Sequence, residues 1–245
     1  MAVKYDIASI THVGNKRTVN QDRIFAQSEN GGRALLAVAD GMGGLAYGER
    51  ASSLVVAGLK RFWDTHPVEL ELKEISTLLD ASIFEMHRRI YTLGEEIGAQ
   101  TGSTLSLLYL QTDAYLIKQI GDSRVYCIEG GQLRQLTTDQ TWYNQVVARK
   151  EMTPEQAHRH RLSHALINAL GVSPELQIVT GQGTPAGGMS FLLCSDGFYA
   201  QASLELLTGD LRRQTPKAAL GVLKEQVLLG DAGDNLSAIL CRLTK

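Results

Sequence analysis

The sequence predicts an α+β protein in which antiparallel β-sheets are covered by helical layers. Short apolar segments follow one another with only a turn between them across residues 103–137, and parallel neighbours would each need a crossover of about a dozen residues. Strands are grouped with strands and helices with helices, which disfavours an alternating doubly wound fold. The 245 residues contain no Pro/Ser-rich linker and no long charge run, so we expect one domain over residues 1–245.

Each expected element follows from its local pattern. Segments rich in Val, Ile, Leu, Tyr or Thr and mostly bounded by Gly, Asp or Asn predict strands. They cover residues 33–40, 103–110, 114–120, 124–128, 132–137, 176–182, 190–195 and 235–243. Apolar residues three or four apart predict helices over 51–63 and 75–90. A second pair of helices is expected at 163–170 and 217–229.

The segment 138–171 differs from its surroundings in composition. It is polar and contains Trp142, Tyr143 and three of the six histidines. Thr153 stands where it can cap a helix that begins with Pro154. We therefore expect a helical insertion on the surface, placed over a site.

Composition limits the classes of partner. The net charge is -2, which gives no broad electrostatic reason to bind nucleic acid or an anionic membrane. No stretch approaches the roughly 20 apolar residues of a membrane span, and the N-terminus has no signal-peptide core. Cys127, Cys194 and Cys241 lie far apart in apolar stretches, which is typical of buried, reduced thiols. These features predict a cytoplasmic protein.

A glycine-rich stretch offers a first functional hypothesis. Residues 36–48 read "LAVADGMGGLAYG" and can be written as G-x-G-x-x-A between a strand and a helix, the context of a dinucleotide fingerprint. Asp40, however, directly precedes the first glycine and places an anion where a pyrophosphate would approach. No second strand ends in an acidic residue about 20 residues later, as that fold requires. Dinucleotide binding is therefore the weaker alternative.

Carboxylates at strand ends offer a second hypothesis. Asp40, Asp122 and Asp196 each end an apolar run beside Gly or Ser, and Asp22 and Asp234 lie in similar settings. A single Asp of this kind is explained as a turn residue, but five at strand termini can converge on one edge. Clustered carboxylates repel one another unless a cation neutralises them. Hard oxygen ligands suit Mg²⁺ or Mn²⁺, and paired ions of this kind serve displacement at phosphorus.

Eight motifs together carry a family resemblance that spans nearly the whole chain. In their order, the sequence resembles bacterial members of the metal-dependent Ser/Thr protein phosphatases of type 2C. The motifs are "RTVNQD" (17–22), "VADGMGG" (38–44), "TGST" (101–104), "GDSRVY" (121–126), "LTTDQ" (136–140), "INALG" (167–171), "LLCSDG" (192–197) and "GDNLSAIL" (233–240).

The resemblance implies a four-layer α/β/β/α sandwich with a binuclear metal centre at one end of two central antiparallel sheets. Asp40 would bridge two Mn²⁺ or Mg²⁺ ions, with the Gly41 carbonyl as a further ligand of one ion. Asp196 and Asp234 would bind the other. The implied reaction is hydrolysis of phosphoserine and phosphothreonine by attack of a metal-bridging hydroxide.

The resemblance also assigns supporting roles. Asp22 would support the metal centre, and Asp122 would form a third metal site with help from Asp196. Arg17 would bind the substrate phosphate, a task that suits the planar, permanently charged guanidinium. The segment 138–171 would be the family's flap beside the substrate entrance. The implied partners are a phosphorylated protein and a cognate Ser/Thr kinase, and we expect a monomer.

Two positions depart from the family pattern. Met42 and Leu45 occupy places where relatives carry histidine, so neither can protonate the leaving alkoxide. A metal-bound water or a flap histidine would then serve as general acid. The departure at Leu45 favours an alternative function, a catalytically weak phosphoprotein-binding or regulatory module with the same fold. Metal-dependent hydrolysis of p-nitrophenyl phosphate separates the two hypotheses.

Overall fold

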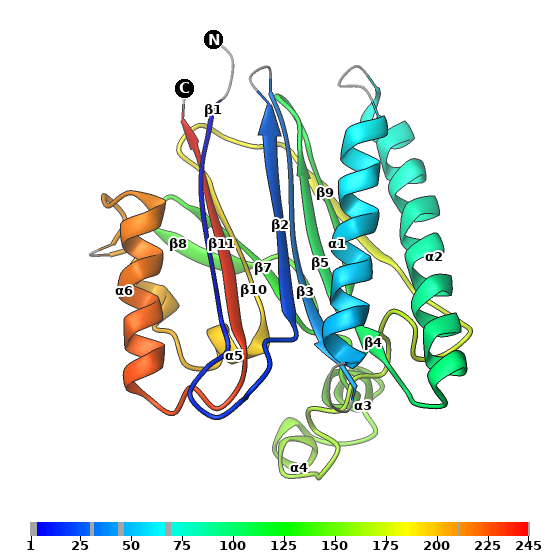
Figure 1. Cartoon of the computed structure of the whole chain (residues 1–245). Helices are drawn as coiled ribbons and strands as arrows, with labels where there is room; N and C mark the ends of the chain where they lie inside the picture. The colour runs from blue at the N-terminus through cyan, green and yellow to red at the C-terminus, as the bar shows by residue number, and fades with distance from the viewer. Residues whose placement is uncertain (1–3, 30–31, 44–46, 67–69, 210, 245) are drawn as a thin grey trace.

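Two antiparallel β-sheets stacked face to face form the centre of the computed structural model, which describes residues 4–29, 32–43, 47–66, 70–209 and 211–244 (Figure 1). The first sheet has the order β1 (Lys4–His12), β11 (Leu236–Thr244), β10 (Ser190–Cys194), β7 (Arg124–Glu129) and β8 (Gln132–Gln135). The second has the order β2 (Asp22–Glu29), β3 (Arg33–Met42), β5 (Leu105–Leu110), β6 (Tyr115–Ile120) and β9 (Val179–Gly183), and the short β4 (Gly102–Ser103) pairs with β3.

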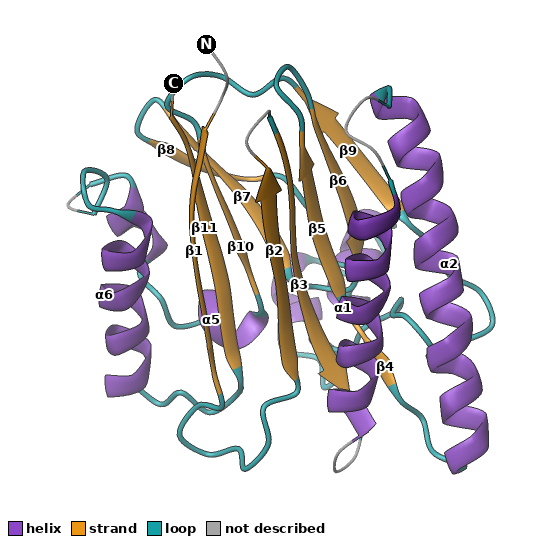
Figure 2. Ribbon diagram, turned by 45° about the horizontal axis from the view of Figure 1, so that its top comes forward, coloured by secondary structure: helices purple, strands orange, loops and turns teal. Residues whose placement is uncertain are grey.

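Helices cover the outer faces of both sheets, as Figure 2 shows. The long helices α1 (Tyr47–Thr65) and α2 (Leu72–Ile97) lie on the second sheet, and α6 (Pro216–Leu229) lies on the first. The shorter α3 (Trp142–Ala148), α4 (Pro154–His158), α5 (Asp196–Tyr199) and the 3₁₀ turn Leu204–Leu207 complete the described helices. The predicted four-layer α/β/β/α sandwich is confirmed.

Three hydrophobic clusters hold the layers together. One lies between the two sheets and includes Val38 and Phe191. A second joins α1 and α2 to the second sheet through residues such as Leu59 and Ile83, and a third joins α6 to the first sheet around Leu223. Every strand pair within the sheets is antiparallel, in agreement with the short turns in the sequence.

Several local predictions differ from the structure. The strands β1 and β2 are not predicted, because neither carries an apolar run: no residue of β1 is fully buried, and β2 has two buried residues among eight. The predicted helix at 163–170 is wrong. Its backbone bonds to distant segments instead, with Ile167 N–H donating to Gln140 O (2.9 Å) and Leu170 N–H to Ser103 O (2.9 Å). The predicted strand at 176–182 begins only at Val179.

Local signals explain where the main helices begin and end. The helix α2 starts with a capping box formed by Glu71 and Glu74 and ends at Gly98, whose φ of 61° suits glycine. The helix α6 begins with Thr215, which accepts a hydrogen bond from Ala218 N–H, followed by Pro216. Among the described residues, no helix has the length and apolar character that crossing a membrane requires.

Candidate metal centre

Five aspartates gather at one end of the two sheets. Asp22 opens β2 and lies directly opposite Asp40 near the end of β3. Asp122 lies in the turn between β6 and β7, Asp196 is the first residue of α5 directly after β10, and Asp234 lies two residues before β11. Because antiparallel neighbours alternate in direction, the end of one strand and the start of the next meet at the same edge. The structure thus brings together all five carboxylates that the sequence singles out.

Asp22 is the most deeply buried member of the cluster. Its side chain is 1% exposed, and its Oδ2 accepts a hydrogen bond from Ser195 Oγ (2.7 Å). Its Oδ1 is buried and has no hydrogen-bond partner within the described ranges of the chain. Burial raises the pKa of Asp22 to about 6, while the Ser195 hydrogen bond favours the ionised form. A buried carboxylate oxygen without a partner is costly unless a cation or water binds it.

Asp40, Asp122 and Asp196 also hold protons more tightly than usual. Burial, followed by the charges of the neighbouring aspartates, raises the pKa of Asp40 well above its usual range. Burial and then the charge of Asp196 raise the pKa of Asp122 to about 7. The pKa of Asp196 rises through burial and the charge of Asp234. Such mutual repulsion is relieved by protons or by a bound cation, so the cluster is suited to bind positive charge.

Arg17 provides one positive charge at the edge of this cluster. Its Nη2 donates to Asp234 Oδ2 (2.8 Å), and both side chains are about half exposed. The second oxygen of Asp234 accepts a hydrogen bond from the backbone N–H of Asn235 (2.8 Å). The hydrogen bond to Asp234 raises the pKa of Arg17, with smaller contributions from Asp40 and Asp196. The candidate phosphate ligand therefore pairs with a candidate metal ligand.

Asn235 is a positioning residue that the sequence interpretation does not single out. Its Nδ2 donates to the carbonyls of Val13 (2.9 Å) and Val19 (3.0 Å), and its Oδ1 accepts from Gln21 N–H (2.8 Å). One amide thereby fixes the loop that carries Arg17 against the start of β11. The signal that could have identified Asn235 is its place in the sequence, directly after the candidate metal ligand Asp234 in the motif "GDNLSAIL".

The glycine-rich stretch serves close packing. A Cβ on Gly41 would lie 2.0 Å from the carbonyl oxygen of Gly48, so the first turn of α1 packs directly on this backbone. Thr104 holds the neighbouring residue in place, because its Oγ1 accepts from Asp40 N–H (2.9 Å) and its N–H donates to Asp40 O (2.8 Å). Both sheet neighbours of β3 are antiparallel, and a dinucleotide fold requires parallel ones. The dinucleotide hypothesis is wrong, and Leu45 lies outside the described residues.

The donor chemistry of the cluster fits a divalent cation. In the described part of the chain, no three His, Cys, Asp or Glu side chains are arranged around a single point as metal ligands, and one oxygen of Asp234 is bound to Arg17 instead. Asp40 is nevertheless within electrostatic range of the four other carboxylates, and Asp22 Oδ1 has no hydrogen-bond partner among the described residues. Carboxylate oxygens are the ligands that Mg²⁺ and Mn²⁺ take.

Hydrogen bonds fasten both ends of residues 138–171, which we name the flap segment, beside the carboxylates. At its start, Gln140 N–H donates to Gly121 O (3.0 Å), and Gln140 Oε1 accepts from Gly121 N–H (2.7 Å). Asn168 Nδ2 also donates to Gln140 Oε1 (2.7 Å). At its end, Leu170 and Ser103 exchange backbone hydrogen bonds. Since Gly121 precedes Asp122 and Ser103 pairs with Gly41, the flap segment is rooted at the candidate metal centre.

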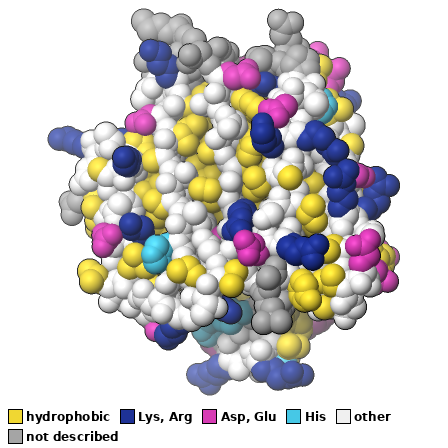
Figure 3. All heavy atoms as spheres, viewed as in Figure 1, with side chains coloured by type: hydrophobic (Ala, Val, Ile, Leu, Met, Phe, Trp, Pro, Cys, Tyr) yellow, Lys and Arg dark blue, Asp and Glu magenta, His cyan; other side chains and the backbone are white. Residues whose placement is uncertain are grey.

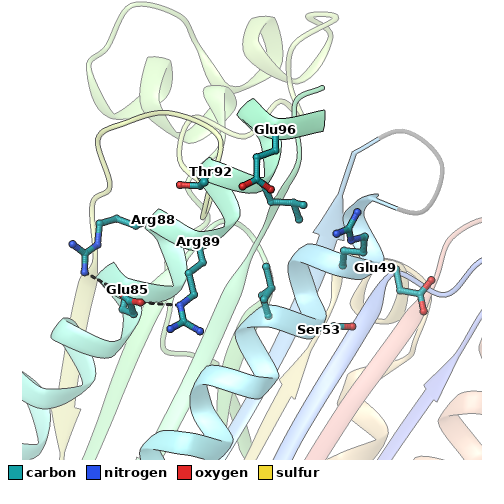
Figure 4. A pocket seen from close by; sticks show the side chains of 10 residues that line it. Glu49, Ser53, Glu85, Arg88, Arg89, Thr92 and Glu96 are labelled. Atoms are coloured by element: carbon teal, nitrogen blue, oxygen red, sulfur yellow. Dashed lines mark hydrogen bonds and ion pairs between the residues drawn. The ribbon is translucent and has the colours of Figure 1, made fainter. Parts of the chain in front are cut away.

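A groove of about 800 Å³ lies elsewhere, between α1 and α2 (Figure 4). Leu54 and Leu93 contribute apolar surface, and its charged residues include Glu85, whose carboxylate pairs with Arg88 (2.5 Å) and Arg89 (2.8 Å). None of the five aspartates lines it. Volume alone therefore does not identify the reactive site in this molecule.

Comparison with known protein families shows to which family this chain belongs. Residues 11–228 match the family model described as Protein phosphatase 2C. The chain belongs to the protein phosphatase 2C family. It is therefore a protein phosphatase, a hydrolase, and the family resemblance predicted from the eight motifs is confirmed.

Curated bacterial relatives agree with this assignment. The chain is 31% identical to protein phosphatase PhpP of Streptococcus pneumoniae over 214 residues, which cover 84% of this chain and 85% of PhpP. It is 30% identical to the serine/threonine phosphatase stp of Listeria monocytogenes over 237 residues, which cover 94% of this chain and 92% of stp. It thus matches these phosphatases over most of their length.

Solved structures share the fold. The crystal structure of the Mycobacterium tuberculosis serine/threonine phosphatase PstP has a TM-score of 0.85 and 31% identity, with 99% of both chains covered. The catalytic domain of PstP in complex with two manganese ions has a TM-score of 0.83, also at 31% identity, and covers 99% of this chain and 100% of that one.

Proposed function

We propose that this protein is a metal-dependent phosphatase that removes phosphate from phosphoserine and phosphothreonine in proteins and so opposes a Ser/Thr kinase. The observation that carries the proposal is the cluster of five carboxylates, four of which (Asp22, Asp40, Asp122 and Asp196) have raised pKa values, in a chain of the protein phosphatase 2C family. The manganese-bound structure of PstP supports it. We further expect a cytoplasmic monomer whose partners are a phosphoprotein and its kinase.

The proposed metal ligands are the residues that the motifs single out. Asp40 would lie between two Mn²⁺ or Mg²⁺ ions, the Gly41 carbonyl would bind one of them, and Asp196 and Asp234 would bind the other. Asp22 would support the centre through its unpartnered Oδ1. When bound, divalent ions act as Lewis acids and lower the pKa of a water molecule toward neutrality.

Two supporting roles complete the proposed site. Asp122 would contribute to a third, weaker metal site together with Asp196, whose charge already raises the pKa of Asp122. Arg17 would bind the phosphate, because its guanidinium offers paired donors that stay charged. This role requires Arg17 to leave Asp234, and metal binding by Asp234 would release it. Asp234 would thus exchange Arg17 for a metal ion, and Arg17 would exchange Asp234 for the substrate phosphate.

Proton supply to the leaving serine or threonine oxygen is a separate requirement. Met42 has no acidic proton, and Leu45 has none either. Among the flap histidines, His164 is exposed and lies in electrostatic range of Asp196, where it opposes a small part of the rise that burial and Asp234 cause in the pKa of Asp196. A water molecule in the centre or this histidine is the proposed proton donor.

The decisive test is metal-dependent turnover. We expect the protein to hydrolyse p-nitrophenyl phosphate and a phosphothreonine peptide with Mn²⁺ and to lose activity after chelation. Asp196→Asn should lower kcat by at least about a hundredfold and weaken Mn²⁺ binding, because a neutral amide is a poorer ligand. The matched control, Asp64→Asn, changes an exposed aspartate on α1 that pairs with Lys60 and should leave both unchanged.

The alternative function predicts a different outcome. A catalytically weak binding module would hold the phosphopeptide with Mn²⁺ present and release no phosphate. Full activity in Asp196→Asn would contradict the ligand assignment and leave the family membership intact. The alternative is disfavoured, because the relatives matched over most of their length are named as phosphatases.

A further inference from the structure

The flap segment carries an excess of positive charge in an otherwise acidic protein. Residues 138–171 contain four Lys and Arg against three Asp and Glu, a net charge of +1, whereas the rest of the chain carries -3. One of the three acidic residues, Asp139, is paired with Arg124 (2.7 Å) outside the segment. The two short helices α3 and α4 lie within this stretch. We call the following residues the basic flap set: Arg149, Lys150, Arg159 and Arg161.

Three members of the basic flap set have no acidic partner among the residues that the structure describes. All four side chains are exposed. Of these four, only Arg149 forms an ion pair in the part of the chain that the structure describes, with 3.8 Å between it and Glu151. By contrast, Arg88 and Arg89 on α2 both pair with Glu85. The charges of Lys150, Arg159 and Arg161 are therefore available to an external anion.

The short helices of the flap segment form a packed unit. The ring of His160, between Arg159 and Arg161 in the sequence, stacks on Trp142 with 4.2 Å between centroids. Val146 and Ala157 are buried, and a capping box formed by Thr153 and Gln156 fixes the start of α4. The backbone on which the two arginines stand is thus held in place, which lowers the entropic cost of using them for recognition.

This unit stands beside the carboxylate cluster. Its ends are bonded to Gly121 and Ser103, neighbours of Asp122 and of the Gly41 backbone. His164 of the same segment lies within electrostatic range of Asp196. Figure 1 places α3 and α4 at the end of the sheets where β2 begins and β3 ends, and Figure 3 shows Lys and Arg side chains along that lower edge.

We propose that the basic flap set selects phosphosites that are flanked by acidic residues. The proposal rests on the phosphatase function above and specifies its substrate class. Because the flap segment is bonded beside the carboxylate cluster, Arg159 and Arg161 can pair with Asp or Glu side chains that flank a phosphate bound in the cluster. The positive flap also offsets the repulsion that acidic substrates meet at the aspartates.

The experiment compares two phosphothreonine peptides that differ only in their flanking residues, three Asp or Glu in one and Asn or Gln in the other. For the unaltered protein with Mn²⁺ at low salt, we expect kcat/KM to be about tenfold higher for the acidic peptide, with the preference shrinking above 0.3 M salt as screening increases. In Arg159→Glu/Arg161→Glu this preference should disappear through a higher KM, while kcat/KM for the neutral peptide stays within about twofold.

A charge-matched control separates local recognition from the overall charge. The variant Arg61→Glu/Lys217→Glu makes the same change in net charge with exposed residues. Arg61 lies fourteen residues into α1 and Lys217 in the first turn of α6, each about 20 Å along its helix from the end that approaches the aspartates. This variant should keep the preference for the acidic peptide. The milder Arg159→Gln/Arg161→Gln should show an intermediate preference.

Several outcomes would overturn the proposal. Equal kcat/KM of the unaltered protein for both peptides would refute it, as would equal losses in the flap variant and the charge-matched control. Flap-dependent binding to anionic vesicles or duplex DNA without any peptide preference would reassign the surface to those partners. Failure of the phosphatase function itself looks different, because neither peptide and no p-nitrophenyl phosphate would then be hydrolysed.

Discussion

At the scale of single residues, the ion pair between Arg17 and Asp234 joins the proposed phosphate ligand to a proposed metal ligand. The pair is about half exposed on both sides, so its net contribution to stability is small. Its importance lies in competition, since the Asp234 carboxylate that binds Arg17 is also a proposed metal ligand. Asn235 holds both partners in reach, because it follows Asp234 and fixes the loop that carries Arg17.

Removing the guanidinium tests this competition. We expect Arg17→Ala to raise KM for a phosphothreonine peptide by about tenfold with a smaller effect on kcat, because a charge-assisted pair of donors to phosphate is lost. Mn²⁺ binding, measured by calorimetric titration, should become as tight or tighter, because Asp234 is no longer occupied. Lys16→Ala is the control, as Lys16 pairs with the exposed Asp231. Weaker Mn²⁺ binding in Arg17→Ala would contradict the exchange.

At the scale of elements, a buried lysine connects α2 to the second sheet. Lys118 lies in the middle of β6, and its side chain is 1% exposed. Its Nζ contacts Asp80 of α2 (2.6 Å), donates to Ser76 Oγ on the same helix (2.8 Å) and donates to Thr180 Oγ1 on β9 (3.0 Å). A lysine this deep needs such partners, since an unpaired buried charge is costly.

Breaking this link by removing one partner should be costly. We expect Asp80→Ala to lower the free energy of unfolding by about 2 kcal/mol, because Lys118 is then left buried without its ionic partner, while the partial exposure of Asp80 limits the loss. In urea unfolding, Asp80→Ala/Lys118→Met should regain most of that loss. The control, Asp64→Ala, breaks the exposed pair with Lys60 and should cost less than about 1 kcal/mol. Equal costs of the two single variants would contradict this account.

At the scale of the whole molecule, the carboxylate cluster links stability to pH and to metal. The folded protein holds protons on Asp122 (pKa about 7) and Asp22 (pKa about 6), whereas the unfolded chain releases them near pH 4. Between these values the folded state binds more protons, so the stability of the metal-free protein falls as the pH rises. Metal binding needs ionised carboxylates and has the opposite dependence.

This linkage predicts that the stability of the metal-free protein and that of the Mn²⁺-bound protein change with pH in opposite directions. After chelation, the free energy of unfolding should be about 2 kcal/mol larger at pH 5.5 than at pH 7.5, and Asp122→Asn should remove most of the difference. The control Asp64→Asn should retain it. With saturating Mn²⁺ the protein should be more stable at pH 7.5, as thermal unfolding can measure. A metal-free protein that loses stability on acidification to pH 5.5 would contradict the raised pKa values.

Prediction from sequence succeeds where the signal is local. The apolar runs that become β3, β5, β6, β7, β10 and β11 are found within a few residues of their observed bounds, because buried strands carry a continuous run of apolar side chains. The strands β1 and β2 lack such runs and form by pairing with β11 and β3. The segment 163–170 has helix-forming residues, yet its hydrogen bonds to Gln140 and Ser103 take precedence, since tertiary contacts override propensity.

The sequence by itself determined the family, the α+β class and the five aspartates at strand ends, because residue type, spacing and motif order are properties of the chain alone. Only the tertiary structure decided that Arg17 pairs with Asp234, 217 residues away, and that Asn235 fixes the loop that carries Arg17. It also decided that the basic flap segment lies beside the aspartates. The physical reason is that such contacts depend on how strands far apart in sequence pair and stack, and no local pattern encodes that distance.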